Sequence, residues 1–200
     1  MDKKQSAREW FDKGCRYESN PSQIENAIAA YKESIRLDNT FPDSYINLGF
    51  IYLKMEDYDE ALKCFLAVVE IENNKPEAYN NLGYVYEKME RFGSAKQMYE
   101  QALAINPGDI EAITNIAHIA DLEGDYHKSV SLYKKAIGLD PSSVSPHFCL
   151  AVLYDRHDMF DEALSEYRHT LVIEPNHIKA RFNMGNLYAQ QGEYEKALEC

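Results

Sequence analysis

Residues 45–52 read YINLGFIY, and residues 79–86 read YNNLGYVY. The two stretches lie 34 residues apart (83 − 49 = 34 for their glycines), and the pair Leu48-Gly49 has counterparts at that interval along the chain. These counterparts are Leu82-Gly83, Ile116-Ala117, Leu150-Ala151 and Met184-Gly185. A constant period of about 20–50 residues is typical of solenoids built from repeated supersecondary units, which bury one continuous core between neighbours.

Each unit is predicted to contain two helices. Tyr45, Leu48 and Tyr52 follow helical spacing and share one face, and a second apolar face follows around Phe65. A polar turn at Glu56-Asp57 separates them, so the second helix is expected to begin near Asp57 or Tyr58, with acidic residues in its first turn.

Small residues inside the predicted helices need a physical reason. A glycine within a helix costs about 1 kcal/mol relative to alanine, yet Gly49, Gly83 and Gly185 fall in the middle of first helices. We therefore expect close packing of the second helix of the same unit at these positions. Prolines such as Pro141 and Pro175 follow the second helices, where they end one helix and prepare the next.

These columns resemble the tetratricopeptide repeat over nearly the whole chain. The resemblance implies an all-α fold, a right-handed superhelical solenoid of antiparallel helix pairs with five full repeats and a truncated sixth. We expect a single solenoid over residues 1–200, with repeats at about 7–41, 42–75, 76–109, 110–143, 144–177 and 178–200, the last incomplete.

Two places depart from the pattern. Gly14 and Ala27 are 13 residues apart, whereas Gly49 and Ala61 are 12 apart, which predicts one extra residue in the turn near Pro21. The sequence also stops at Cys200, within a second helix. Because repeat arrays need a polar cap, we expect either that the natural protein is longer, which we favour, or that another chain covers this end.

The resemblance implies a concave groove lined by first helices, in which extended peptides or partner helices bind. An asparagine column precedes the Leu-Gly column, and its members are Asn47, Asn81, Asn115 and Asn183, with Cys149 interrupting it. It resembles the asparagine ladder in the repeats of O-linked N-acetylglucosamine transferases. An amide side chain offers an acceptor and two donors, which suits a peptide backbone, although solvated asparagines are also ordinary at this position.

Other residues expected in the groove make its charge and polarity vary along its length. The acidic first part contains Asp43, Glu77, Asn80, Tyr84, Glu87, Glu111 and Asp121, and His118 should lie beside Asn115. The fifth unit is apolar through Phe148, Cys149 and Val152. The far end is polar and partly basic through Arg156, Lys179 and Asn186. This predicts a ligand with basic residues at one end and an apolar anchor further along. The alternative is that the acids only keep the solenoid soluble.

Composition and motifs narrow the function classes. The formal net charge of −12, from 33 acids and 21 bases, argues against nucleic acid and anionic membranes as partners. The 4 cysteines are widely separated, which favours free thiols in the cytoplasm or nucleus. The sequence shows no secretory signal or membrane-spanning run. No phosphate loop, nucleophile elbow or recurring pair of metal ligands is apparent, so we expect no enzyme activity, cofactor or metal.

The expected function is therefore that of an adaptor or scaffold that binds a protein or peptide in the groove. The family's paired Lys, Asn and Arg residues for gripping a C-terminal carboxylate are missing, because the corresponding first helices carry Glu77 and Glu111. Two alternatives remain. The chain could be a substrate-recruiting module of a larger enzyme such as a glycosyltransferase. It could also be a self-assembling scaffold of the magnetosome-coat type, forming homo-oligomers through its uncapped C-terminal end.

Overall fold

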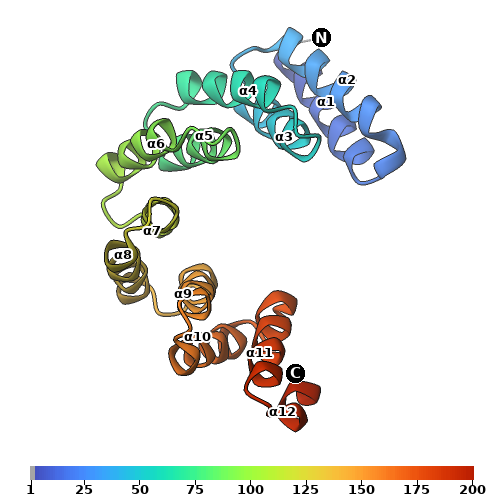
Figure 1. Ribbon diagram of the computed structural model, residues 1–200. Coiled ribbons are helices and arrows are strands. Elements are labelled where there is room, and N and C mark those ends of the chain that lie inside the picture. Colours follow the sequence, from blue (N-terminus) through green and yellow to red (C-terminus); the bar gives the residue numbers. More distant parts are fainter. Residues whose placement is uncertain (1–2) are drawn as a thin grey trace. The chain divides into compact units, whose positions relative to one another are not determined.

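The computed structural model describes residues 3–200, and within this range it contains helices and no strand. It divides into two compact units, one ending at Pro107 and one running from Gly108 to Cys200. Their helices are labelled in Figure 1. The first unit contains α1 (Lys3–Glu18), the 3-10 helix η1 (Pro21–Gln23), α2 (Ile24–Leu37), α3 (Pro42–Lys54), α4 (Tyr58–Ile71), α5 (Pro76–Lys88) and α6 (Phe92–Ile105). The second contains α7 (Ile110–Leu122), α8 (Tyr126–Leu139), α9 (Val144–Arg156), α10 (Phe160–Ile173), α11 (Ile178–Gln190) and α12 (Tyr194–Glu199).

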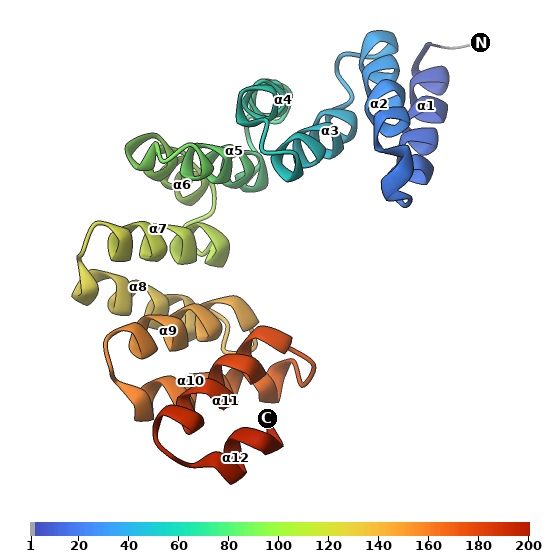
Figure 2. The same cartoon turned by 45° about the vertical axis from the view of Figure 1, so that its right-hand side comes forward.

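Within each unit the helices form pairs that pack in chain order. The two helices of a pair lie side by side, as α5 and α6 do in the first unit and α9 and α10 in the second (Figures 1 and 2). The second helix of each pair also packs against the first helix of the following pair within the unit. The predicted all-α fold of paired helices is confirmed. The division into one solenoid with the six stated repeat ranges stays a prediction.

Local sequence explains where the helices begin and end. Asp57 caps α4 by accepting a hydrogen bond from the backbone N–H of Glu60, and α4 begins at Tyr58 as predicted. Asp125 caps α8 in the same way through the N–H of Lys128. Pro42 occupies the first turn of α3, where a missing N–H costs nothing.

The turns inside the pairs share one backbone feature. The residue that follows each first helix by two positions adopts a left-handed conformation in five successive pairs. These residues are Glu56 (φ 60°), Glu90 (φ 57°), Gly124 (φ 82°), Asp158 (φ 57°) and Gly192 (φ 78°). Since this conformation costs a residue with a side chain roughly 1–2 kcal/mol, three of the turns hold strain that glycine removes in the other two.

The glycine column marks the closest packing inside the pairs. A Cβ atom placed on Gly49 would lie 2.7 Å from the ring of Phe65, and one on Gly83 would lie 2.6 Å from the ring of Tyr99. Both rings are fully buried. The predicted close approach is therefore confirmed, and the group that needs the space is an aromatic side chain of the second helix.

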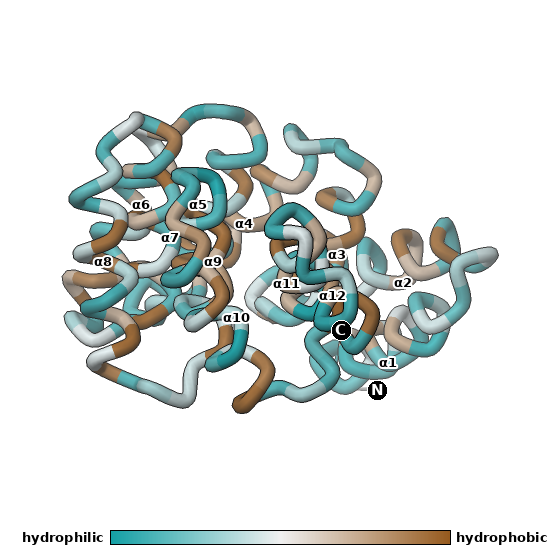
Figure 3. The backbone as a smooth tube through the Cα atoms, turned by 60° about the horizontal axis from the view of Figure 1, so that its bottom comes forward, coloured by the Kyte–Doolittle hydropathy of each residue, from teal (hydrophilic) through white to brown (hydrophobic). Residues whose placement is uncertain are grey.

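Each unit has its own apolar core. In the first unit it includes Tyr31, Leu48, Phe65 and Val85, and in the second it includes Leu150, Tyr154, Tyr167 and Leu187. Apolar and polar residues are interspersed along the helices in Figure 3, as expected for helices that bury one face.

The first turn differs from the others as the sequence predicts. The extra residue falls in η1, where Asn20 accepts hydrogen bonds from the backbone N–H and the hydroxyl of Ser22. The asparagine side chain thus stabilises the connection over residues 19–23, which is longer than the connections inside the later pairs, such as residues 55–57.

Candidate functional site

The asparagine column takes part in packing between repeats. Asn47 and Asn183 are half-buried, and the side-chain amide of each donates to a tyrosine 16 residues earlier in the chain. Asn47 Nδ2 lies 3.0 Å from the Tyr31 hydroxyl, and Asn183 Nδ2 lies 3.1 Å from the Tyr167 hydroxyl. Asn47 Nδ2 is also 3.7 Å from Cys15 Sγ. These two amides therefore join neighbouring helix pairs, a role that their spacing from the tyrosine column could have suggested.

Each of these tyrosine hydroxyls in turn donates a hydrogen bond to a carboxylate. The Tyr31 hydroxyl donates to Glu18 at 2.8 Å, and the Tyr167 hydroxyl donates to Asp155 at 3.3 Å. Burial raises the pKa of both tyrosines above the ordinary value. Burial also raises the pKa of Asp155, more than the hydrogen bond from Tyr167 lowers it. Glu18 and Asp155 therefore join the two helices of their own pairs.

The other two asparagines are also half-buried. The residue 16 positions before Asn81 is Phe65, which has no hydroxyl to accept a hydrogen bond. The role of Asn81 and Asn115 in holding a peptide stays a prediction.

One pocket in the second unit brings several of the residues expected in the groove together. We call it the α7–α9 pocket. Its volume is about 160 Å³, and it is lined by His118, Asp121, Tyr133, Phe148, Cys149, Val152, Leu153 and Arg156. His118 and Asp121 come from α7, while Phe148, Cys149, Val152 and Arg156 come from α9. Its walls are thus mainly apolar, and Cys149 occupies the position that asparagine holds in four other repeats.

Polar and aromatic contacts hold the walls of the pocket. Arg156 forms an ion pair with Asp121, whose side chain is only 9% exposed, while that of Arg156 is 51% exposed. The Phe148 ring lies 4.7 Å from the His177 ring and 6.1 Å from the Tyr167 ring, measured between centroids. The pocket therefore has an ion pair among its lining residues, and the Phe148 ring packs against the rings of His177 and Tyr167.

The remaining predicted residues do not line this pocket. Glu77, Tyr84, Glu111 and Lys179 are exposed on their first helices, and the Lys88 ammonium lies 4.9 Å from the ring centre of Tyr84. The placement of Asn80 on the groove surface was wrong, because Asn80 is only 1% exposed. Its side chain lies on the same side of α5 as Gly83, which is also buried and follows it by about one turn.

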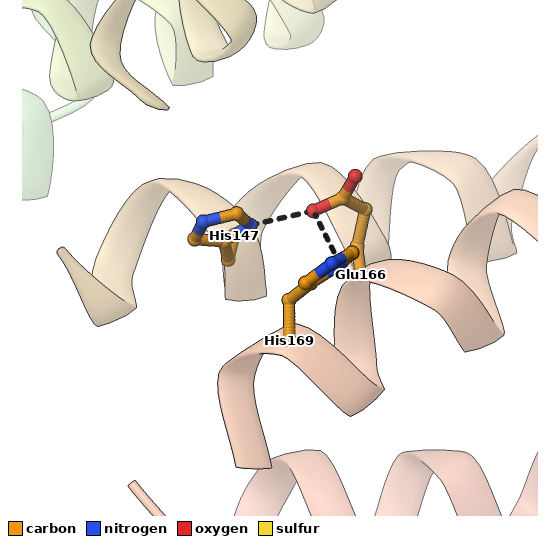
Figure 4. A group of neighbouring side chains, drawn as sticks. All are labelled: His147, Glu166 and His169. Atoms are coloured by element: carbon orange, nitrogen blue, oxygen red, sulfur yellow. Dashed lines mark hydrogen bonds and ion pairs between the residues drawn. The ribbon is translucent and has the colours of Figure 1, made fainter. Parts of the chain in front are cut away.

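A possible metal-ligand set lies elsewhere in the second unit. Among residues 3–200, His147, Glu166 and His169 place one potential ligand atom each within 4.8 Å of the others (Figure 4). Helical spacing in the sequence reveals only ligand pairs that lie on one helix. This set combines Glu166 and His169, one turn apart on α10, with His147 from α9.

An exposed apolar surface lies on the last two helices. A hollow of about 850 Å³ is lined by residues of α11 and α12, including Ile178, Phe182, Tyr194 and Leu198. Phe182 is 66% exposed and Leu198 is 89% exposed.

Among the described residues, no helix has the length and apolar character that crossing a bilayer requires.

Comparison with known proteins agrees with this architecture. Family models of the tetratricopeptide repeat match residues 40–108, 110–143 and 166–199, and one described as TPR repeat matches residues 22–56. No curated protein matches the sequence.

Solved structures show the same fold. MamA is 21% identical with a TM-score of 0.66, over 88% of this chain and 95% of MamA. YrrB, described as a TPR protein with an unusual peptide-binding site, is 22% identical with a TM-score of 0.58, over 91% of this chain and 90% of YrrB. PilF of Pseudomonas aeruginosa is 13% identical with a TM-score of 0.74, over 98% of this chain and 89% of PilF. At such identities the likeness concerns the fold alone. The repeat matches and the paired helices together show that this chain belongs to the tetratricopeptide repeat family.

Proposed function

We propose that this chain is a protein-interaction module that binds an extended peptide or a partner helix, with one apolar side chain of the ligand in the α7–α9 pocket. The observation that carries the proposal is the pocket itself, where apolar side chains of α9 meet the half-buried His118 on α7. Binding sites of this kind are concave and mostly apolar, with a few polar groups that fix orientation.

The size of the pocket suits a single side chain. A cavity of about 150 Å³ lined by apolar residues holds benzene, and the α7–α9 pocket measures about 160 Å³. A leucine, methionine or phenylalanine of the ligand would fill it. Burying such a side chain contributes about 1.5–3 kcal/mol, which is enough to select ligands that carry the anchor.

Polar residues near the pocket would orient the rest of the ligand. Asn115 precedes the small-residue column on α7, and its amide suits a peptide backbone. Exposed Glu111 would favour a basic residue in the ligand, mainly by speeding encounter. The description of YrrB as a peptide-binding protein supports the same mode of action for this fold. We assign the chain no catalytic step, and we expect it to act in the cytoplasm or nucleus.

Peptide binding can be tested with a pair of matched variants. A peptide array that varies the anchor residue and the net charge would first select a ligand, whose affinity is then measured by fluorescence anisotropy. Val152→Met should fill the pocket and weaken binding at least tenfold. Val172→Met makes the same change on α10, where Val172 is 79% exposed and outside the pocket, and should leave affinity unchanged.

Two results would count against this site. One is an unchanged affinity in Val152→Met, provided that its circular dichroism spectrum matches the parent. The other is a consistent preference of the array for acidic ligands without an apolar anchor.

Asn115→Ala should weaken peptide binding several-fold with little change in melting temperature, because the Asn115 side chain is only half-buried.

The apolar surface of α11 and α12 favours a second candidate function, self-assembly through that surface. Exposed apolar patches often mark association sites. Light scattering should then show a mass that rises with concentration and falls to that of a monomer in Phe182→Glu. A parent chain that stays monomeric at high micromolar concentration would count against self-assembly. A substrate-recruiting role within a larger enzyme remains compatible with peptide binding.

A further inference from the structure

The fifth repeat carries a polar cluster in a place where the three repeats before it carry apolar or weakly polar side chains. His147 on α9 is 6% exposed, and its Nδ1 lies 2.6 Å from Oε2 of Glu166 on α10. Nδ1 of His169, one turn further along α10, lies 3.9 Å from the same oxygen. The two imidazole rings are stacked, with centroids 5.4 Å apart and an interplanar angle of 28°. Figure 4 shows both rings directed at the Glu166 carboxylate.

Two positions of the repeat change from apolar or weakly polar to ionisable together in the fifth repeat. His147 and Glu166 stand at positions whose counterparts, at multiples of 34 residues earlier, are apolar or weakly polar. The counterparts of His147 are Tyr45, Tyr79 and Ile113, and those of Glu166 are Cys64, Met98 and Leu132. Packing alone is satisfied by those residue types, so the histidine and the carboxylate in contact are not needed to hold the helix pair together.

Hydrogen bonding fixes which nitrogen of His147 is available. Nε2 lies 3.2 Å from the carbonyl oxygen of Pro141, and a carbonyl can only accept, so Nε2 carries a hydrogen. In the neutral ring Nδ1 then has a lone pair, which faces a carboxylate oxygen at 2.6 Å. Two acceptors this close need a hydrogen between them, carried either by the ring or by the carboxyl group, and a metal ion could replace that hydrogen once the two atoms move apart.

We propose that His147 Nδ1, the Glu166 carboxylate and His169 Nδ1 bind a divalent transition-metal ion, with zinc as the ion that fits best. Two imidazoles and one carboxylate are a ligand set that zinc uses, with a fourth position left to water. Calcium and magnesium prefer oxygen ligands throughout. The Pro141 carbonyl holds His147 in the tautomer that a metal requires, as partners behind ligating histidines generally do.

The distances allow the site to form with small movements. Tetrahedral zinc with bonds of about 2.0–2.1 Å places its ligand atoms about 3.3 Å apart. The present separations from Glu166 Oε2 are 2.6 Å and 3.9 Å, one shorter and one longer than that value. The His169 side chain is 58% exposed, so it can rotate toward the ion without disturbing the core. A bound ion would link α9 to α10 and stabilise the folded chain.

The test uses the whole chain without an affinity tag, stripped of metal with a chelator. Titration with zinc sulfate in a calorimeter should give saturable binding of one ion per chain, and zinc should raise the melting temperature by several degrees. Cobalt at the same site should give the visible absorption of a tetrahedral ion. None of these readouts depends on peptide binding, so the proposed function and this site are tested separately.

Two variants keep the fold while removing a ligand. Glu166→Gln preserves the size of the side chain, and its amide can donate to His147 Nδ1, so the buried contact is retained. His169→Ala removes a largely exposed ring. Each should lower zinc affinity at least tenfold and abolish the cobalt spectrum. His127→Ala, which removes an exposed histidine outside the cluster, should leave both unchanged.

The proposal is overturned if the parent chain shows no saturable zinc binding, since His147 and Glu166 then form only a proton-bridged pair. It is also overturned if Glu166→Gln and His169→Ala bind zinc as tightly as the parent, or if His127→Ala weakens binding to the same extent as His169→Ala. The first of these last two results would place the bound zinc elsewhere on the chain, and the second would place it at a site that includes His127.

Discussion

Adding one methyl group at Gly83 tests the packing that defines the helix pairs. The new Cβ of Gly83→Ala would lie 2.6 Å, 2.8 Å and 2.9 Å from three atoms of the Tyr99 ring. Carbon atoms prefer a separation of about 3.5–4.0 Å, so the ring or the helix must move by about 1 Å. Tyr99 is fully buried, and overpacking of this kind costs about 1–3 kcal/mol.

Two other effects reduce that cost. Alanine gains about 0.5–1 kcal/mol over glycine inside a helix. Alanine also occurs naturally in this column at Ala117, whose second helix carries the buried Tyr133, so a helix pair can adapt to the methyl group. We therefore expect Gly83→Ala to lower the free energy of unfolding by about 1 kcal/mol.

Gly93 provides a matched control in the same helix pair. A Cβ on Gly93 meets no atom within 4 Å, so Gly93→Ala should raise the free energy of unfolding by about 0.5 kcal/mol through helix propensity alone. Urea unfolding followed by far-ultraviolet circular dichroism would compare the midpoints, because repeat arrays need not unfold in a single step. The two variants should move the midpoint in opposite directions.

A double variant assigns the effect to the ring. In a Tyr99→Leu background the obstructing aromatic atoms are gone, so Gly83→Ala should no longer destabilise the chain. If Gly83→Ala raises the midpoint as much as Gly93→Ala does, close packing is not the reason for glycine in this column.

The remaining predictions concern the turns, the asparagine column and a buried thiol. Glu90→Gly should raise the free energy of unfolding by about 1 kcal/mol by relieving a left-handed conformation at φ 57°, whereas Glu90→Ala should give no such gain in the same urea assay. Asn47→Ala should cost about 0.5–1.5 kcal/mol because the hydrogen bond to Tyr31 is lost, and Asn81→Ala should cost much less; equal losses would contradict this assignment. Burial raises the pKa of the Cys64 thiol to about 12, so its unfolded form ionises first and stability falls as pH rises above about 8.5, by at most about 1.4 kcal/mol per pH unit. Thermal melts between pH 8 and 11 should show a shallower decline for Cys64→Ala, and parallel declines would refute the role of this thiol.

Much of the architecture could be predicted from the sequence because the residues that define each helix pair lie within one repeat or its neighbours. A solenoid unit contacts only its neighbours, so the columns around Gly49 and Phe65 reveal a helix pair without knowledge of distant parts of the chain. Asp57 and Pro42 likewise act within one turn of their own positions, and a cap or a proline has the same local effect wherever it occurs.

Tertiary structure decided which side chains meet across helices, and this determined the candidate sites. The sequence placed Asn47 in a column suited to peptides, but only the packing of neighbouring pairs showed that its amide reaches Tyr31. The same applies to His147 and Glu166, which are 19 residues apart on different helices. Helical periodicity predicts the face on which a residue lies. It does not predict the rotamer or the partner, because these depend on the shape of the space that the facing helix leaves.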